Sequence, residues 1–194
     1  MVPPPKNVKK LERKAVHDVA DHGVFRVQRH EYEGLPRPIF VFECRDWCNV
    51  IAETERGDVV FVWQYRFGTD ALSLEIPGGV IDAGEEPIVA AARELREETG
   101  YEAASIELLS VVEPNPALQG NRCFTFLARG ARLAGPTSFD DCEDLEVALV
   151  PKTDLAALLD SGQLTHALVT GPLETYLRRF VDRGSSSMTS PSNS

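Results

Sequence analysis

The chain has 194 residues and a formal net charge of −10, with 43% hydrophobic and 26% charged residues. This length suffices for one domain with its own core, and the composition is ordinary for a soluble globular protein. No apolar run approaches the roughly 18 residues of a membrane span. The negative charge argues against a nucleic acid partner, because no basic run with interleaved aromatic residues offsets it. An acidic protein that handles phosphates would therefore need a cation as a bridge.

The two ends of the chain are polar. Residues 1–12 predict a flexible arm, and their basic start is followed by no apolar stretch that would indicate a secretory signal. The Ser-rich end, 184–194, predicts a disordered tail. Between them we expect one domain over 13–183 without internal repeats, with an N-terminal β region over about 13–45.

The cysteines favour a reducing compartment. Cys44 and Cys48 are separated by three residues, but no second Cys or His pair completes a zinc site. We expect ordinary thiols rather than a metal centre at these positions, and hence a cytoplasmic location.

In chain order, alternating apolar residues between turn signals predict strands at 24–32, 37–44, 47–54, 58–67, 72–76, 105–112, 123–130 and 145–150. A helix is expected from Glu86-Pro87 to Gly100, because proline suits the first turn of a helix and glycine its end. Two further helices are expected at 153–162 and about 164–183. One helix among many strands, with two more at the end, predicts an α+β sandwich.

The helix before Gly100 carries two neighbouring stripes. Its apolar residues fall at i, i+3, i+4 and i+7 and predict the buried stripe Ile88, Ala91, Ala92 and Leu95. Three acids fall at i, i+3 and i+4 on the next stripe: Glu94, Glu97 and Glu98. These carboxylates should therefore lie at the edge of whatever the helix packs against.

Acids on a helix often form only a solvated face, yet this group breaks local rules. Like charges at i, i+4 cost roughly 0.2–0.5 kcal/mol per pair. Negative charge in the last turn opposes the helix dipole at roughly 0.3–1 kcal/mol each. Arg93 can pair with Glu97 at i, i+4, but one arginine cannot neutralise three carboxylates. The pattern therefore favours a site for a divalent cation such as Mg²⁺, which prefers oxygen ligands and substrate phosphates.

The same residues resemble the Nudix box, G-x5-E-x7-R-E-U-x-E-E-x-G-U, in which U is a bulky apolar residue. The fixed positions are matched by Gly79, Glu85, Arg93, Glu94, Glu97, Glu98 and Gly100, with Leu95 and the aromatic Tyr101 at the two U positions. The flanking strand pattern is also similar to that of the Nudix fold. The resemblance implies an α/β/α sandwich around a mixed β-sheet.

The resemblance implies hydrolysis of a nucleoside diphosphate linked to another group. It implies that the three box glutamates, helped by the backbone carbonyl at Gly79, hold Mg²⁺ or Mn²⁺, and that Glu85 and Arg93 orient that cluster. Metal ions of this kind neutralise phosphate charge and lower the pKa of a bound water. In-line attack by that water would split the P–O–P link. In this scheme Glu97 and Arg93 belong to the catalytic group.

Residues outside the box resemble the ADP-ribose and nucleoside diphosphate sugar pyrophosphatases. The similar stretches are QYRFG at 64–68, SLEIPGG at 73–79, and Pro116. The likeness implies that Arg66 grips a phosphate and that Glu75 lines the site. The alternatives are a surface arginine at a strand end and an outward-facing strand residue.

The stretch after Pro116 departs from the ADP-ribose enzymes, because it carries Asn, Gln and Arg in place of acids and is closer to hydrolases of sugar nucleotides. Asn121 and Arg122 could contact a phosphate or sugar, or could close the loop. Trp47 could stack on a nucleobase, with a core or dimer role as the alternative.

A general base must take the proton from the water. In relatives it often comes from a late acidic loop, which makes Glu143 the first candidate here and Asp141 the second; the alternative is a solvated loop. His166 is expected to be structural. The resemblance also implies a homodimer built through the N-terminal strands.

Two other functions remain open. One is a different substrate, either a nucleoside triphosphate or capped RNA. The other is a non-catalytic sensor of ADP-ribose or a nucleotide sugar, against which the intact box argues.

Overall fold

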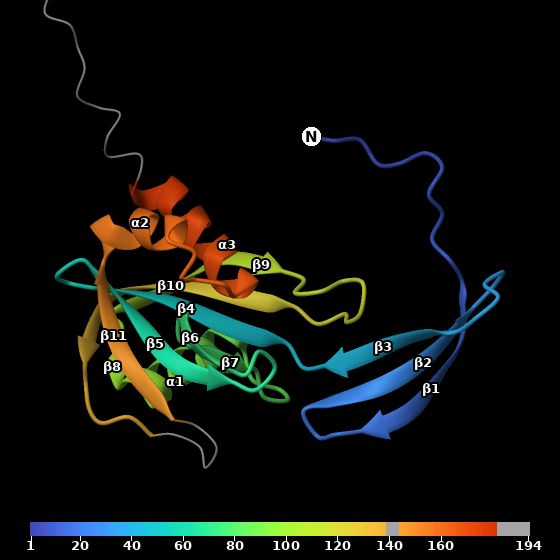
Figure 1. The fold of residues 1–194 in the computed structure, drawn as a ribbon, viewed down its shortest axis with the longest axis horizontal. Helices are drawn as coiled ribbons and strands as arrows, with labels where there is room; N and C mark the ends of the chain where they lie inside the picture. The colour runs from blue at the N-terminus through green and yellow to red at the C-terminus, as the bar shows by residue number, and fades with distance from the viewer. Residues whose placement is uncertain (139–143, 182–194) are drawn as a thin grey trace, which may run out of the picture. The chain divides into compact units, whose positions relative to one another are not determined.

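The computed structural model describes residues 1–138 and 144–181. The chain divides into two compact units, one formed by residues 1–45 with 113–121 and the other by residues 46–112 with those from 122 onward. Figure 1 shows the helices and strands of both units. The predicted tail at 184–194 lies outside the described residues.

The first unit is a three-stranded antiparallel sheet in the order β1 (Arg13–Asp21), β2 (Phe25–Tyr32) and β3 (Ile39–Cys44). The strands predicted at 24–32 and 37–44 are confirmed as β2 and β3, which pair as an antiparallel hairpin. Residues 113–121 close against the end of β3, where the backbone N–H of Phe42 donates to the carbonyl of Leu118 at 2.8 Å. Asn121 is buried, and its Nδ2 donates to the carbonyl of Arg45 at 2.9 Å.

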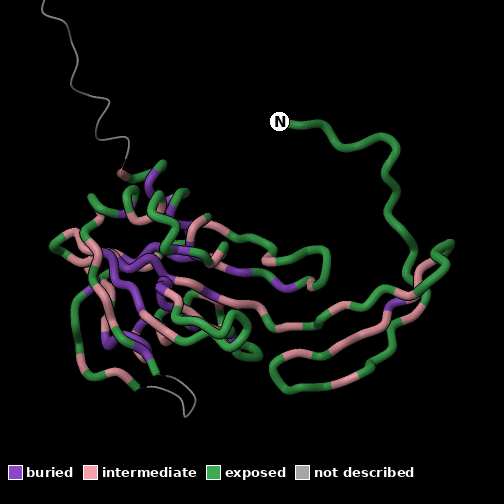
Figure 2. The backbone as a smooth tube through the Cα atoms, in the orientation of Figure 1, coloured by how far each residue is buried: buried purple, intermediate pink, exposed green. Residues whose placement is uncertain are grey.

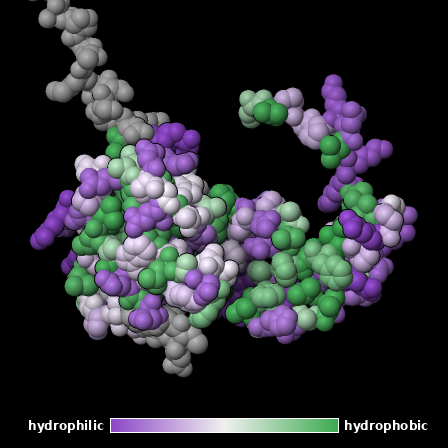
Figure 3. Space-filling view, viewed as in Figure 1, coloured by the Kyte–Doolittle hydropathy of each residue, from purple (hydrophilic) through white to green (hydrophobic). Residues whose placement is uncertain are grey.

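Apolar side chains of this first sheet remain exposed. His30 is the one residue of β1–β3 that is buried, and the strands are otherwise half-buried or exposed (Figure 2). The exposed large hydrophobic residues of these strands are Val16, Val19, Ile39, Phe40 and Phe42. Hydrophobic side chains gather on the face of this unit that Figure 3 presents.

The second unit is built on an eight-stranded mixed sheet. Its main order is β11-β5-β4-β10-β8, with β6 paired to β5, β7 to β4 and β9 to β10. The pairing of β4 with β10 is parallel and the other pairings are antiparallel. The strands are β4 (Trp47–Thr54), β5 (Asp58–Arg66), β6 (Ala71–Glu75), β7 (Gly78–Val80), β8 (Tyr101–Glu102), β9 (Ser105–Val112), β10 (Cys123–Leu133) and β11 (Leu145–Pro151).

Helices cover both faces of this sheet (Figure 1). Residues alternate along β4, so Val50 and Ala52 pack with α1 (Pro87–Thr99) in one core. Ile51 packs in the other core with α3 (Ala167–Tyr176), near α2 (Leu155–Asp160). A single 3-10 turn, η1 (Lys152–Asp154), precedes α2, and a π-helical turn, η2 (Leu177–Val181), follows α3. The predicted α/β/α sandwich is confirmed. No helix in the described ranges is long and apolar enough to cross a membrane.

The predicted apolar stripe of α1 is wrong at two positions. Ile88 is 44% exposed and Ala92 is also exposed. The buried residues of the helix are instead Ala90, Ala91, Leu95, Glu98 and Thr99. The small pair Ala90–Ala91 faces the sheet and the last turn lies against β7, so the buried arc is rotated toward the glutamates.

Candidate active site

Glycines allow β7 to pass closely between β4 and α1. Gly78 and Gly79 pair with Asn49 and Cys48 of β4. A Cβ at Gly78 would overlap the carbonyl oxygen of Cys48, and a Cβ at Gly79 would lie 2.5 Å from the Glu94 carboxylate. Glycine is therefore required here for close approach of the backbone to a side chain of the box.

The helix α1 ends where the sequence predicts. Pro87 occupies its first turn, and Gly100 closes it in the left-handed region at φ 74°. The Gly100 N–H donates to the carbonyl of Arg96 at 2.9 Å, which satisfies one of the unpaired carbonyls of the last turn. This turn carries the two adjacent box acids, Glu97 and Glu98.

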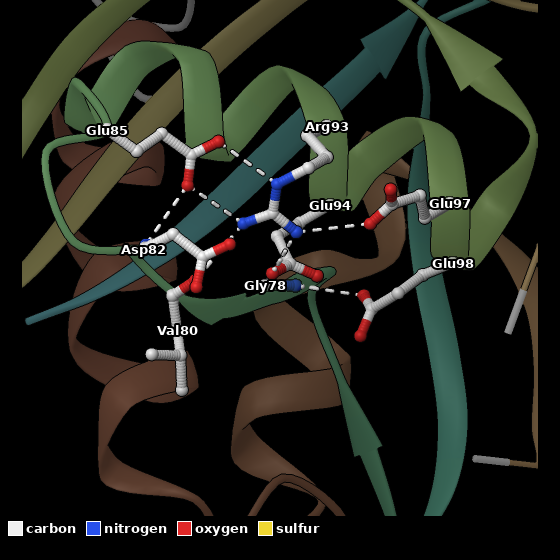
Figure 4. A network of polar contacts seen from close by, with 8 residues as sticks. All are labelled: Gly78, Val80, Asp82, Glu85, Arg93, Glu94, Glu97 and Glu98. Atoms are coloured by element: carbon white, nitrogen blue, oxygen red, sulfur yellow. Dashed lines mark hydrogen bonds and ion pairs between the residues drawn. The ribbon is translucent and has the colours of Figure 1, made fainter. Parts of the chain in front are cut away.

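The three box glutamates differ in exposure. The side chains of Glu94 and Glu97 are 12% and 43% exposed, and the residue Glu98 is 4% exposed overall. The backbone N–H of Gly78 donates to Glu98 Oε2 at 2.9 Å, as Figure 4 shows. Two nearly buried carboxylates, Glu94 and Glu98, thus converge on the Gly78–Gly79 backbone, while Glu97 faces outward.

Arg93 links three acids of the box, Glu85, Glu94 and Glu97, into one network (Figure 4). Its guanidinium forms a fork with Glu85, with both N–H···O distances at 3.0 Å. The same group donates to Glu94 at 2.8 Å, to Glu97 at 3.1 Å and to the carbonyl of Val80 at 3.2 Å. The fork from Arg93 lowers the pKa of Glu85, and in return the carboxylates raise the pKa of Arg93. The predicted orienting role of this pair therefore has the geometry that it needs.

The chemistry of these groups suits a hard divalent cation, although their arrangement is not a coordination sphere. Within residues 1–138 and 144–181, no group of three or more His, Cys, Asp or Glu side chains is arranged to hold a metal ion. Arg93 engages Glu94 and Glu97, and Glu98 is turned to the Gly78 N–H. Carboxylates and backbone carbonyls are nonetheless the donors that Mg²⁺ prefers. The Gly79 backbone and the Glu94 carboxylate lie so close together that a Cβ at Gly79 would not fit between them. This proximity suits a set of ligands made of carboxylate and backbone carbonyl oxygens.

Arg66 and Glu75 form a second ionic group. Arg66 Nε and Nη2 donate to the two Glu75 oxygens at 2.9 and 2.8 Å. Glu75 is only 3% exposed, so the alternative of an outward-facing strand residue is wrong. Burial acts to raise the pKa of Glu75, but hydrogen bonds from Arg66 and His166 and the charge of Arg66 outweigh it and hold that pKa well below its ordinary range. The carboxylate is therefore ionised.

Trp47 and Arg122 lie at the start of two parallel strands. Trp47 is half-buried and pairs with Val80 of β7. The Arg122 guanidinium forms a fork with Asp46, at 2.7 and 3.2 Å, and stacks over the Phe124 ring. Because Asp46 already holds Arg122, the loop-closing alternative has direct support.

Three features of the site were missed from sequence. His166 Nδ1 lies 2.9 Å from Glu75 Oε2, although 91 residues separate them. Asp46 holds Arg122, and the segment 134–138 is bound to α1. In that segment the N–H of Ser138 donates to the Glu97 carbonyl at 2.8 Å, and Arg96 donates to the Pro136 carbonyl at 2.9 Å. No local signal marks these contacts, because each joins residues far apart in the chain.

Two predicted groups have other outcomes. Asp141 and Glu143, the candidate bases, lie outside the described residues. The thiols of Cys44, Cys48 and Cys123 are free. Burial raises the pKa of both Cys48 and Cys123 to about 12, as expected for ordinary core thiols.

The two-sided sandwich, the glycine strand β7 and the acidic last turns of α1 together define a Nudix-type domain. A family model described as NUDIX domain matches residues 45–169. The chain belongs to the Nudix family.

Its relatives include hydrolases of nucleotide compounds. The chain is 34% identical over 115 residues to CMP-5'-(N-acetyl-N-hydroxy-3-aminopropyl)phosphonate hydrolase of Streptomyces rubellomurinus, over 59% of this chain and 55% of that protein. It is 30% identical over 152 residues to ADP-ribose pyrophosphatase of Mycobacterium tuberculosis, over 69% of this chain and 72% of that protein. The chain thus spans little more than half the length of the first of these relatives. A crystal structure of an ADP compounds hydrolase has the same fold, with a TM-score of 0.78 at 22% identity over 93% of this chain and 99% of that one.

Proposed function

We propose that the chain hydrolyses the pyrophosphate bond of a nucleoside diphosphate linked to a sugar, giving a nucleoside monophosphate and a sugar phosphate, with Mg²⁺ or Mn²⁺ as cofactor. One observation carries the proposal. Two nearly buried carboxylates of α1, Glu94 and Glu98, converge on the Gly78–Gly79 backbone, where there is no room for side chains. The names of the Streptomyces and Mycobacterium relatives, both hydrolases of nucleotide compounds, support the substrate class.

Glu94, Glu97, Glu98 and the Gly79 carbonyl would hold the divalent ion. When bound there, it would offset phosphate charge and lower the pKa of a bound water. Arg93 holds Glu94 and Glu97 close together, because its guanidinium donates hydrogen bonds to both and is itself fixed by Glu85. The box thus tolerates its own repulsion through an arginine.

Arg66 is proposed to bind a substrate phosphate, because its side chain is 45% exposed while its fork to Glu75 fixes its direction. Trp47, half-buried beside β7, is proposed to contact the nucleobase. Arg122 is a weaker candidate for substrate binding, because Asp46 already engages it. For the general base we propose Glu143, with Asp141 second.

A sensor without turnover is the main alternative, and a nucleoside triphosphate hydrolase is another. The test is a panel of ADP-ribose, nucleotide sugars and nucleoside triphosphates with Mg²⁺, run on the wild type and on Glu98→Gln. We expect nucleoside monophosphate from a diphosphate-linked sugar, and a loss of several orders of magnitude in turnover for the variant. Tight binding without turnover of any compound would favour the sensor, and near-normal rates in Glu98→Gln would contradict the role of that residue.

We also propose a cytoplasmic homodimer. The exposed Phe40 and Phe42 of β3 support it, because a second copy could cover an apolar sheet that has only one buried residue of its own. Sedimentation at the mass of a monomer would contradict the dimer.

A further inference from the structure

The fork between Arg66 and Glu75 has a third member. Glu75 Oε2 accepts from Arg66 Nη2 at 2.8 Å and lies 2.9 Å from Nδ1 of His166. An ionised carboxylate can only accept hydrogen bonds, so Nδ1 of His166 must carry the proton in this contact. His166 is thus a donor to the same oxygen that holds the arginine.

Burial is distributed unevenly over the three side chains. The Glu75 side chain is 4% exposed, whereas those of Arg66 and His166 are 45% and 40% exposed. A buried carboxylate deprived of its partners is costly, because no water replaces the lost hydrogen bonds. Together with a hydrogen bond from Ser73, the donor from His166 keeps the Glu75 carboxylate fixed beside Arg66.

The backbone holds His166 in place for this contact. It directly precedes α3 in an extended conformation (φ −81°, ψ 117°), and its side chain makes no capping hydrogen bond to the helix. Its carbonyl accepts from the N–H groups of Val169 and Thr170 at 2.9 and 3.0 Å. Asn49 Nδ2 donates to the Leu168 carbonyl at 2.8 Å, and Asn49 pairs with Gly78. The start of α3 is therefore anchored to the strand pair β4–β7, which bears Gly78 and the box glycine Gly79.

We propose that His166 is a positioning residue for phosphate binding, which acts by holding Glu75 so that the Arg66 fork stays aligned toward the substrate. The proposal rests on the proposed function, because it takes Arg66 as the group that meets the phosphate. His166 itself makes no contact with the substrate in this scheme.

The test measures ADP binding by calorimetry in the presence of Mg²⁺. His166→Ala should raise the Kd roughly tenfold, because Arg66 is then no longer preorganised to meet the phosphate. His166→Asn should restore affinity to within about threefold of the wild type, because the short amide can donate from the position of Nδ1. His166→Gln, whose amide reaches the position of Nε2, should not. This pair of variants keeps the test valid if the alanine variant fails to fold.

A double-mutant cycle with Arg66→Ala separates positioning from general stability. If His166 acts through Arg66, His166→Ala should have little further effect on the Kd in the Arg66→Ala background. An equal loss in both backgrounds, wild-type affinity in His166→Ala, or no ADP binding by the wild type would each overturn the proposal. Turnover is measured separately. If the double-mutant cycle gives the expected result but the wild type hydrolyses none of the compounds, the hydrolase proposal is wrong and the positioning role of His166 still holds.

Discussion

At the scale of single residues, the site depends on two arginines that hold acids in place. Arg93 joins Glu85, Glu94 and Glu97, and Arg66 holds a nearly buried Glu75. The two groups differ in exposure, because Glu97 faces solvent whereas Glu75 does not. Ionisation of Glu75 should therefore affect the free energy of unfolding more strongly than ionisation of Glu97.

The lowered pKa of Glu75 predicts an acid-dependent loss of stability. Above its ordinary value of 4.5 the carboxylate is ionised in both states, and its pairing contributes fully to the free energy of unfolding. As the pH falls below 4.5, the unfolded chain takes up the proton first, so that contribution is lost. Glu75→Gln should cost about 1–3 kcal/mol at neutral pH.

Urea unfolding between about pH 7 and pH 3 measures this effect. The difference in stability between the wild type and Glu75→Gln should narrow as the pH falls. The exposed Glu146 of β11 offers a control, and Glu146→Gln should stay within about 0.5 kcal/mol of the wild type at neutral pH. A difference in stability between the wild type and Glu75→Gln that does not change with pH would contradict the lowered pKa of Glu75.

At the scale of elements, the helix α1 is fixed at its end by the segment that follows β10. Both Ala134 and Gly135 donate backbone N–H groups to the Gly100 carbonyl, at 2.9 and 3.3 Å. A Cβ at Gly100 would overlap the carbonyl oxygen of Gly135. Gly100 thus holds the turn that bears Glu97 and Glu98, and any larger residue at this position would displace Gly135.

Gly100→Ala should destabilise the fold by at least about 2 kcal/mol, because strain at positive φ adds to the overlap with Gly135. Gly84→Ala is the matched control, since Gly84 also has a positive φ, 82°, but has nothing within 4 Å of its Cβ position. It should cost about 1 kcal/mol, from backbone strain alone. Equal losses for the two variants in urea unfolding would show that the packing against Gly135 is unimportant.

The helix α1 was predictable because two local residues mark its ends: Pro87 in the first turn and Gly100 at the C-terminus. Its buried face was not, because the exposure of Ile88 and Ala92 depends on how the helix lies on the sheet. The strand β1, with its charged and weakly alternating sequence, and the short strands β7 and β8 were not predicted individually; they are defined by their partners.

The site divides in the same way. The box network follows from its spacing, and the predicted pairing of Arg93 with Glu97 is confirmed. The buried state of Glu75 and its contact with His166 could not be predicted, because they depend on where α3 begins over the sheet.

At the scale of the whole molecule, negative charge dominates. A net charge of −10 repels phosphate compounds at long range, so a divalent cation would serve both to bring a diphosphate to the site and to offset the box acids. Within the described residues, Arg93 forms ion pairs with both Glu94 and Glu97. We therefore expect a divalent ion to join this cluster together with the substrate.

The most direct test of that claim is the binding of Mn²⁺ to the full chain in the presence of ADP, followed by electron paramagnetic resonance. We predict that the wild type together with ADP binds Mn²⁺ more tightly than either ADP or the protein alone. Glu98→Gln should lose at least about 90% of this gain in Mn²⁺ affinity, because the substitution removes a charged ligand. A wild type that binds no Mn²⁺ with ADP present, or a Glu98→Gln variant that binds it equally well, would contradict the central claim.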